Sequence, residues 1–197
     1  MIRSLAAAFF LSATAAMAQV QGVELDAPVE LPAFMFSNTD GQTFTEASLD
    51  GQWTIVMFGF NSCPDVCPFT LANLEQAISE TALRVRPDNV PKVVFVSVDP
   101  ARDGEVVGEY AAYFHPEFIG VTGEREMIDR LVEATDSFYR LLKPDHTGFY
   151  DVQHSSAVSV ISPDGALRAK LQPPFDPGMT AEFLARLQIK YRREATN

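Results

Sequence analysis

The chain has 197 residues, of which 47% are hydrophobic, and a formal net charge of −11 at pH 7. This length and apolar content suffice for one globular domain with a sizeable core. The acidic balance argues against nucleic acid and anionic membrane surfaces as partners, because both are negatively charged.

The first 18 residues have the pattern of a secretory signal peptide. Arg3 supplies the positive end, an apolar stretch follows, and the segment closes on AMA, which matches an A-x-A cleavage site. The apolar stretch is too short and too rich in alanine for a transmembrane helix. We therefore expect a signal peptide at 1–18 and one mature domain at 19–197. We expect that domain in the periplasm, an oxidising compartment, without stable membrane insertion.

Predicted strands and helices then alternate along the chain. In order they are a hairpin at 34–45, a strand at 53–60, a helix ending near 83, a strand at 92–98, a helix at 105–114, a short strand at 118–121, a helix at 124–138, a hairpin at 157–171 and a helix at 180–191. Thr180 is the expected N-cap of the last helix.

The only two cysteines stand where the first long strand gives way to a helix. The sequence WTIVMFGFNSCPDVCP leads from that strand through Cys63 and Cys67, after which apolar residues recur at helical spacing. A helix N-terminus favours the thiolate, the form that attacks disulfides and binds metal. If the first turn begins near Cys63, the α-carbons lie roughly 6 Å apart, within reach of a disulfide. The pair can thus be a disulfide, a redox couple or two soft metal ligands.

The order of elements, with both thiols after the first core strand, predicts the fold class. It is that of an α/β domain with a thioredoxin-like fold, here with an N-terminal β-hairpin extension. Three histidines remain as site candidates. His115 ends a predicted helix and is expected to be a surface cation there. His146 is expected in a mobile loop, and His154, just before a hairpin, by itself favours a hydrogen-bonded structural role.

Three stretches together resemble the SCO/SenC family of copper chaperones. They are GFNSCPDVCP at 59–68, VSVDPARD at 96–103 and HSSAVSVISPDG at 154–165, in the order in which the family has them. The resemblance implies a thioredoxin-like fold that binds Cu(I) or Cu(II) through Cys63, Cys67 and His154.

The resemblance also implies a partner and a task. Family members help assemble the binuclear copper centre of cytochrome c oxidase, so the expected partner is the copper-centre subunit of that oxidase or another periplasmic copper protein. Asp99 matches an acidic position near the family's site. The residue before the histidine is often Asp in the family but is Gln153 here, and an amide orients an imidazole more weakly than a carboxylate does.

The residue types agree with copper. Two thiolates suit Cu(I), and an imidazole makes the site acceptable to Cu(II). Three protein ligands leave the coordination open, whereas structural zinc normally has four. We therefore expect a metallochaperone rather than an enzyme.

Two other interpretations of the cysteine pair are compatible with the sequence. The main alternative is a thiol–disulfide oxidoreductase that keeps the copper-ligating cysteines of the oxidase reduced. Three residues separate the cysteines, however, against two in the usual redox motif. An inert disulfide is the second alternative, although so short a loop constrains the unfolded chain little.

Overall fold

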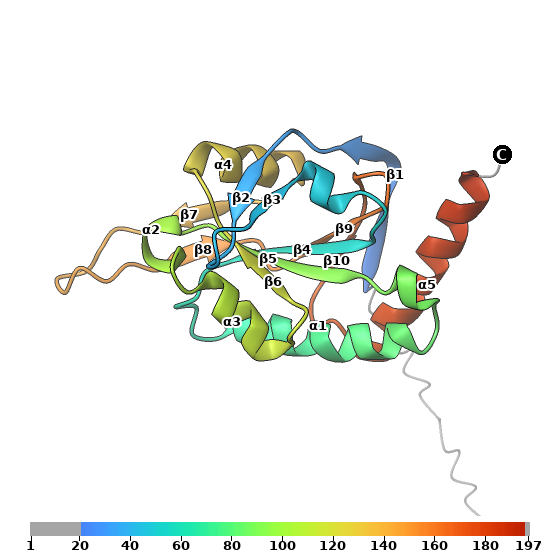
Figure 1. The fold of residues 1–197 in the computed structure, drawn as a ribbon. Coiled ribbons are helices and arrows are strands. Elements are labelled where there is room, and N and C mark those ends of the chain that lie inside the picture. Colours follow the sequence, from blue (N-terminus) through green and yellow to red (C-terminus); the bar gives the residue numbers. More distant parts are fainter. Residues whose placement is uncertain (1–20, 196–197) are drawn as a thin grey trace, which may run out of the picture.

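The computed structural model describes residues 21–195, so the predicted signal peptide lies outside the described part. Its centre is a six-stranded mixed sheet (Figure 1). The strands lie in the order β1 (Gly22–Glu30), β10 (Ala166–Leu171), β9 (Val158–Ile161), β4 (Thr54–Gly59), β5 (Lys92–Ser97) and β6 (Ile119–Val121). The strands β4, β5 and β6 run parallel, and the remaining neighbours pair antiparallel. Within residues 21–195, no helix combines the length and apolar character that a membrane span requires.

Different elements cover the two faces of the sheet, because side chains alternate along each strand. Ile55 and Met57 face a core shared with α1 (Val66–Ala82), α3 (Val107–Phe114) and α5 (Pro177–Glu194). Val56 and Phe58 face a second core, shared with α4 (Arg125–Ala134) and with the hairpin of β2 (Met35–Ser37) and β3 (Thr43–Thr45). Every residue of β4 is buried, as expected for a central strand covered on both faces. The predicted strands and the N-terminal hairpin are confirmed.

One predicted helix is too long. The prediction extends it to residue 138, whereas α4 ends at Ala134 and the chain re-enters a strand, β7 (Tyr139–Leu141). Asp136 has a φ of 47°, a left-handed conformation that ends helices. The new strand pairs antiparallel with β8 (Val152–His154) in a separate hairpin, which the sequence pattern did not predict.

The start of the last helix also differs from the prediction. The N-cap is Asp176 rather than Thr180, and its side chain accepts a hydrogen bond from the Met179 amide at 2.9 Å. Pro177 occupies the first helical position, where its missing N–H costs nothing. Thr180 is buried inside the first turn.

Several short or irregular elements were not predicted. They are β1, α2 (Pro100–Asp103) and the 3₁₀ turns at Glu46–Leu49 and Pro87–Asn89. The strand β1 is mostly exposed, and its register with β10 shifts between Glu24 and Val29. Apolar residues do alternate with polar ones or proline along it, at Val23, Leu25, Ala27 and Val29, but Pro28 counts against a regular strand.

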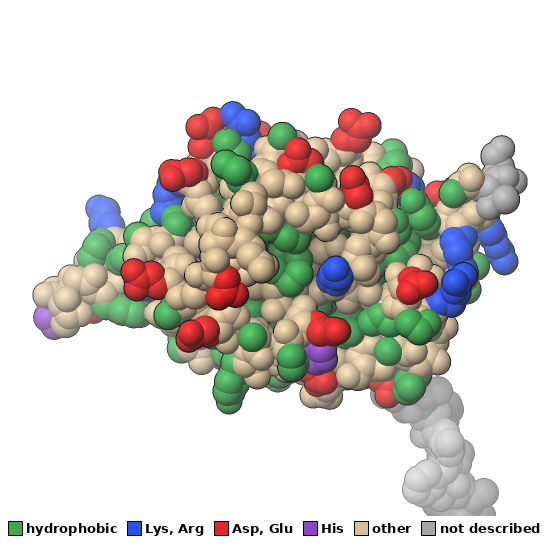
Figure 2. All heavy atoms as spheres, in the orientation of Figure 1, with side chains coloured by type: hydrophobic (Ala, Val, Ile, Leu, Met, Phe, Trp, Pro, Cys, Tyr) green, Lys and Arg blue, Asp and Glu red, His purple; other side chains and the backbone are tan. Residues whose placement is uncertain are grey.

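The face shown in Figure 2 carries acidic side chains without one dominant patch. Figure 2 shows acidic side chains scattered over one face and basic ones gathered at the far end of α5. Arg192 and Arg193 lie in the last turn of that helix, where positive charge complements the helix dipole.

Candidate metal centre

The turn after β4 places the first cysteine ahead of the helix. The N–H of Cys63 donates to the carbonyl oxygen of Phe60 at 3.2 Å, and α1 begins only at Val66. The helix therefore begins three residues later than the start near Cys63 that the expected α-carbon separation assumed. The reason is Pro64, because a residue that precedes proline is driven away from helical backbone angles.

The second cysteine lies within the first turn and is fully buried. Its backbone N–H donates to Sγ of Cys63 at 3.4 Å. The sulfur of Cys63 thus accepts a hydrogen bond from the positive end of the helix, which stabilises its negative charge. The dipole of α1 acts on the thiol outside the helix as well as on the one within it.

The pKa values of the two thiols are shifted in opposite directions. Hydrogen bonding from Cys67, chiefly from its side chain, lowers the pKa of Cys63 to about 4. The same hydrogen bond and burial raise the pKa of Cys67. The thiolate form is therefore favoured at Cys63 and the thiol form at Cys67.

A glycine makes room for the buried thiol. A Cβ at Gly59 would lie 2.7 Å from Sγ of Cys67 and 2.6 Å from a ring carbon of Phe95. Both distances are far shorter than van der Waals contact, so any larger residue would displace the sulfur or the ring. The glycine that ends β4 thus allows the thiol to pack directly against the strand.

The third candidate ligand, His154, comes from a part of the chain far from the cysteines. His154 is the last residue of β8, and its Nε2 lies 3.3 Å from Sγ of Cys67. Its Nδ1 lies 2.9 Å from the carbonyl oxygen of Ser155. A carbonyl only accepts hydrogen bonds, so Nδ1 carries a proton, and in the neutral ring Nε2 is then the nitrogen with the lone pair. This is the tautomer that binds metal through Nε2.

The structure therefore brings together the three residues that the sequence singled out. Their ligand atoms all lie within 4.8 Å of one another. Cys63 and His154 also line a pocket of about 530 Å³, whose rim includes Val66 and the exposed ring of Phe138. The cluster is accessible from this pocket, while its deepest member, Cys67, is shielded.

The other two histidines lie elsewhere. His115 follows the last residue of α3, as predicted, with its ring against Phe118 and its Nδ1 accepting from the Glu117 amide. His146 is exposed in the loop between β7 and β8. Neither belongs to the thiol–imidazole cluster.

Asp99 is near the centre but bonds elsewhere. Its carboxylate accepts hydrogen bonds from Arg102 and from the hydroxyl of Tyr150, rather than from a candidate ligand. Gln153 is exposed beside His154 and lines the same pocket.

Sequence reasoning missed one buried carboxylate. Asp103 accepts hydrogen bonds from the Asn61 amide at 2.8 Å and from the Ser97 hydroxyl at 2.6 Å. Burial raises its pKa, and its charge contributes to the raised pKa of Cys67. Its position four residues after Asp99 was the available signal, since residues at that spacing share a helix face.

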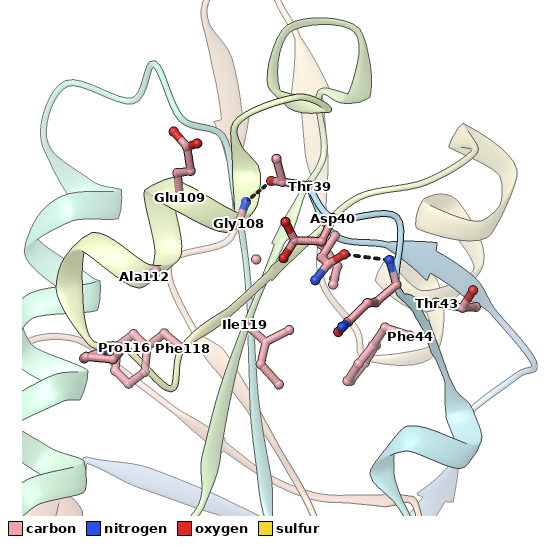
Figure 3. A pocket seen from close by; sticks show the side chains of 14 residues that line it. Thr39, Asp40, Thr43, Phe44, Gly108, Glu109, Ala112, Pro116, Phe118 and Ile119 are labelled. Atoms are coloured by element: carbon pink, nitrogen blue, oxygen red, sulfur yellow. Dashed lines mark hydrogen bonds between the residues drawn. The ribbon is translucent and has the colours of Figure 1, made fainter.

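A separate pocket of about 420 Å³ lies between the β2–β3 turn, α3 and β6 (Figure 3). Thr39 closes one side, where its hydroxyl accepts a hydrogen bond from the Gly108 amide at 2.8 Å. Asp40 and Glu109 lie at its margin and Phe44 and Ile119 line it. It shares no lining residue with the pocket of the thiol–imidazole cluster.

Comparison with known proteins agrees with this geometry. The family model described as SCO1/SenC matches residues 24–188. The mitochondrial protein SCO1 homolog of Homo sapiens is 35% identical over 164 residues, which cover 82% of this chain and 54% of that protein. The chain thus spans about half the length of this relative.

Solved structures show the same fold. Arabidopsis thaliana ScoI with copper bound is 32% identical, with a TM-score of 0.72 over 81% of this chain and 98% of that one. Yeast Sco1 with copper bound is 26% identical, with a TM-score of 0.73 over 83% and 90% of the two chains. The predicted thioredoxin-like α/β class is thereby confirmed.

Proposed function

This chain belongs to the SCO1/SenC family, and on that premise we propose that it is a copper metallochaperone whose ligands are Cys63, Cys67 and His154. The observation that carries the proposal is the convergence of two sulfurs and one imidazole nitrogen within 4.8 Å. Copper is the metal also named with the Arabidopsis and yeast structures.

The donor set explains why copper fits. Thiolates are soft ligands that favour Cu(I), and an imidazole extends the site to Cu(II). Cys63 favours the thiolate form, chiefly because of its interaction with the side chain of Cys67 and also because the backbone amide of Cys67 donates to its sulfur. Only the proton of Cys67 must leave when a metal binds, and His154 Nε2, at 3.3 Å, is placed to accept it or to share the metal.

A site with only three protein ligands supports the transfer of copper to a partner rather than its storage. Three protein ligands leave a position free for an incoming ligand of a partner. The pocket beside Cys63 and His154 gives that ligand access, and the exposed ring of Phe138 on its rim offers an apolar contact. The partner that we propose is the copper-centre subunit of cytochrome c oxidase, as the resemblance to the SCO/SenC family implies.

We further propose that the protein acts in the periplasm. This rests on the sequence pattern of residues 1–18, which matches a cleavable signal peptide. An exported location also gives the cysteine pair an oxidising environment, in which copper or a reductant must protect it.

A second candidate function, thiol–disulfide exchange, is favoured by one observation. Cys63 is partly exposed with a lowered pKa, whereas Cys67 is buried with a raised one. An accessible thiolate beside a buried thiol is the arrangement by which an attacking cysteine and a resolving cysteine reduce a disulfide. The substrate would be the oxidised cysteine pair of the same oxidase subunit.

One experiment separates the two functions. The reduced protein, loaded with copper or free of it, is mixed with a soluble oxidase copper-site fragment in reduced or disulfide form. We expect efficient copper transfer to the reduced fragment and slow turnover in a generic disulfide-reduction assay. Fast multiple-turnover reduction without copper transfer would reverse this order.

A further inference from the structure

The strand that carries His154 is not part of the main sheet. Among the described strands β8 pairs with β7 alone, with Tyr139 opposite His154. The loop that joins the two strands, residues 142–151, projects from the body of the molecule (Figure 1). An isolated two-stranded hairpin is marginally stable in water. The position of His154 therefore depends on the contacts that attach this hairpin to the rest of the protein.

One arginine makes several of those contacts. Arg102 lies in α2, and its Nη1 donates to the carbonyl oxygen of Tyr150 at 2.9 Å. Its guanidinium carbon lies 3.9 Å from the centroid of the Tyr150 ring and 5.9 Å from that of Phe149. Arg102 thus contacts two consecutive residues just before β8. A planar guanidinium can stack on a ring and donate hydrogen bonds at once, which an ammonium cannot.

A buried carboxylate holds this arginine in place. Asp99 is fully buried, and it accepts hydrogen bonds from Nε of Arg102 and, at 3.0 Å, from the hydroxyl of Tyr150. A buried charge without a partner is strongly unfavourable. Asp99, just after β5, therefore fixes Arg102 and Tyr150 together relative to the main sheet.

The arginine also reaches the histidine through an aromatic ring. Its guanidinium carbon lies 5.4 Å from the centroid of Phe60. The ring of Phe60 in turn meets the ring of His154 edge-on, with centroids 6.0 Å apart and an interplanar angle of 85°. Arg102 is therefore linked to His154 by two routes, along the hairpin through Tyr150 and across the ring of Phe60.

We propose that Arg102, held by Asp99, is a positioning residue that locks the β7–β8 hairpin so that Nε2 of His154 points at Cys67. This rests on the proposed copper function, in which His154 is the third ligand. Replacing residues that orient a metal ligand typically lowers affinity by about 10- to 100-fold. The effect falls mainly on Cu(II), which needs the imidazole, because two thiolates suffice to hold Cu(I).

The first test needs no metal. In the reduced protein, nitrogen NMR of the imidazole should show a single tautomer of His154, with its proton on Nδ1. In Arg102→Met, which keeps the apolar stem and removes the guanidinium, we expect these signals to broaden or to average between tautomers. Unchanged His154 signals in folded Arg102→Met protein would overturn the proposal.

The second test titrates Cu(II) and Cu(I) into the reduced protein. We expect Arg102→Met to bind Cu(II) about tenfold more weakly or worse and to lose nitrogen coupling in the electron paramagnetic resonance spectrum. Its Cu(I) affinity should stay within about threefold of the unaltered protein. If Arg102→Met keeps the Cu(II) spectrum and affinity, or loses Cu(I) equally, the positioning role is wrong.

A matched control separates positioning from general stability. Arg168 has a side chain exposed to 17%, against 22% for Arg102, and it pairs with Asp164 and stacks on Tyr191 at 5.0 Å. Arg168→Met thus removes a similarly buried, paired and stacked arginine away from the hairpin. We expect it to lower stability without changing the His154 signals or the copper spectra. The same changes in both variants would contradict the proposal.

A double variant covers the case in which Arg102→Met does not fold, since that change leaves the charge of Asp99 buried alone. Asp99→Asn/Arg102→Met removes both charges and should show the same loss of a single His154 tautomer and the same loss of Cu(II) affinity.

The copper-binding proposal and the positioning proposal would fail in different ways. An unaltered protein that binds no copper would refute the proposed function, whereas the NMR test would still decide whether Arg102 positions His154.

Discussion

Nε2 of His154 lies 3.3 Å from Sγ of Cys67, although the two residues are 87 positions apart in the chain. The thiol comes from the first turn of α1, and the imidazole comes from a hairpin outside the main sheet. The site therefore forms only when both parts of the chain have docked. This dependence makes the histidine the ligand whose removal is most informative.

We predict that His154→Ala loses most of its Cu(II) binding while Cu(I) binding survives better. Cu(I) is satisfied by two thiolates, whereas Cu(II) prefers a nitrogen ligand. His154 is only half-buried at the rim of the core, so the thermal unfolding midpoint should change little. Competition with chelators specific for each oxidation state measures both affinities. An unchanged Cu(II) spectrum and affinity would show that His154 is not a ligand.

The reactivity of the two thiols should differ with pH. Because the pKa of Cys63 is lowered to about 4 and that of Cys67 is raised, Cys63 stays a thiolate through the weakly acidic range and Cys67 stays protonated. Only the thiolate is nucleophilic. Iodoacetamide at about pH 6 should therefore alkylate Cys63 well ahead of Cys67, as measured by mass spectrometry of the peptides.

The direction of the pH profile provides the control. Alkylation of Cys63 should persist as the pH falls and decline only as it approaches the lowered pKa. After unfolding in denaturant the profile should move to the ordinary thiol range, near pH 8.5. Two results would contradict the claim that hydrogen bonding lowers the pKa of Cys63. One is faster alkylation of Cys67 than of Cys63, and the other is a pH midpoint for Cys63 that is the same in native and unfolded protein.

Gly59→Ala should disturb the site through crowding alone. The added Cβ would lie 2.7 Å from Sγ of Cys67, and overpacking of this kind costs about 1–3 kcal/mol of unfolding free energy. Denaturant titration measures the loss, and copper affinity should fall with it. Gly178→Ala is the matched control, because its Cβ would meet only a side-chain oxygen at 3.6 Å. Equal stability of the two variants would refute the crowding argument.

Copper loading and disulfide formation should exclude each other. A disulfide sulfur carries no thiolate charge, so oxidation of Cys63 and Cys67 removes two of the three proposed ligands, and His154 alone should hold copper weakly. The test is to oxidise the protein, verify the loss of free thiols by mass and titrate copper. Tight binding of one copper by the disulfide form would refute the assignment of both cysteines.

Local sequence patterns predicted most of the fold and the two cysteines of the site. The long apolar runs that form β4 and β5 and the turn residues at Pro163–Gly165 carry strong short-range signals. The cysteines were found because they are the only two in the chain. His154 was selected through the family resemblance, since no local signal distinguishes it from a structural histidine.

What the sequence did not predict depends on tertiary contacts. The strands β7 and β8 are separated by residues 142–151, a connection too long to carry the turn signal of a short hairpin. The role of Gly59 follows from the approach of Phe95 and Cys67, and the contacts of Arg102 with Tyr150 join residues 48 positions apart. Such relationships exist only in the folded chain, because no local preference encodes them.

The central claim is that two sulfurs and one imidazole nitrogen bind copper, and X-ray absorption at the copper edge tests it most directly. The reduced protein is loaded with one equivalent of Cu(I) or Cu(II), beside a Cys63→Ser/Cys67→Ser variant. We predict two sulfur neighbours in both oxidation states, one nitrogen of imidazole type in the Cu(II) form, and no stable loading of the double variant. A copper coordinated only by nitrogen and oxygen in the unaltered protein would contradict the account.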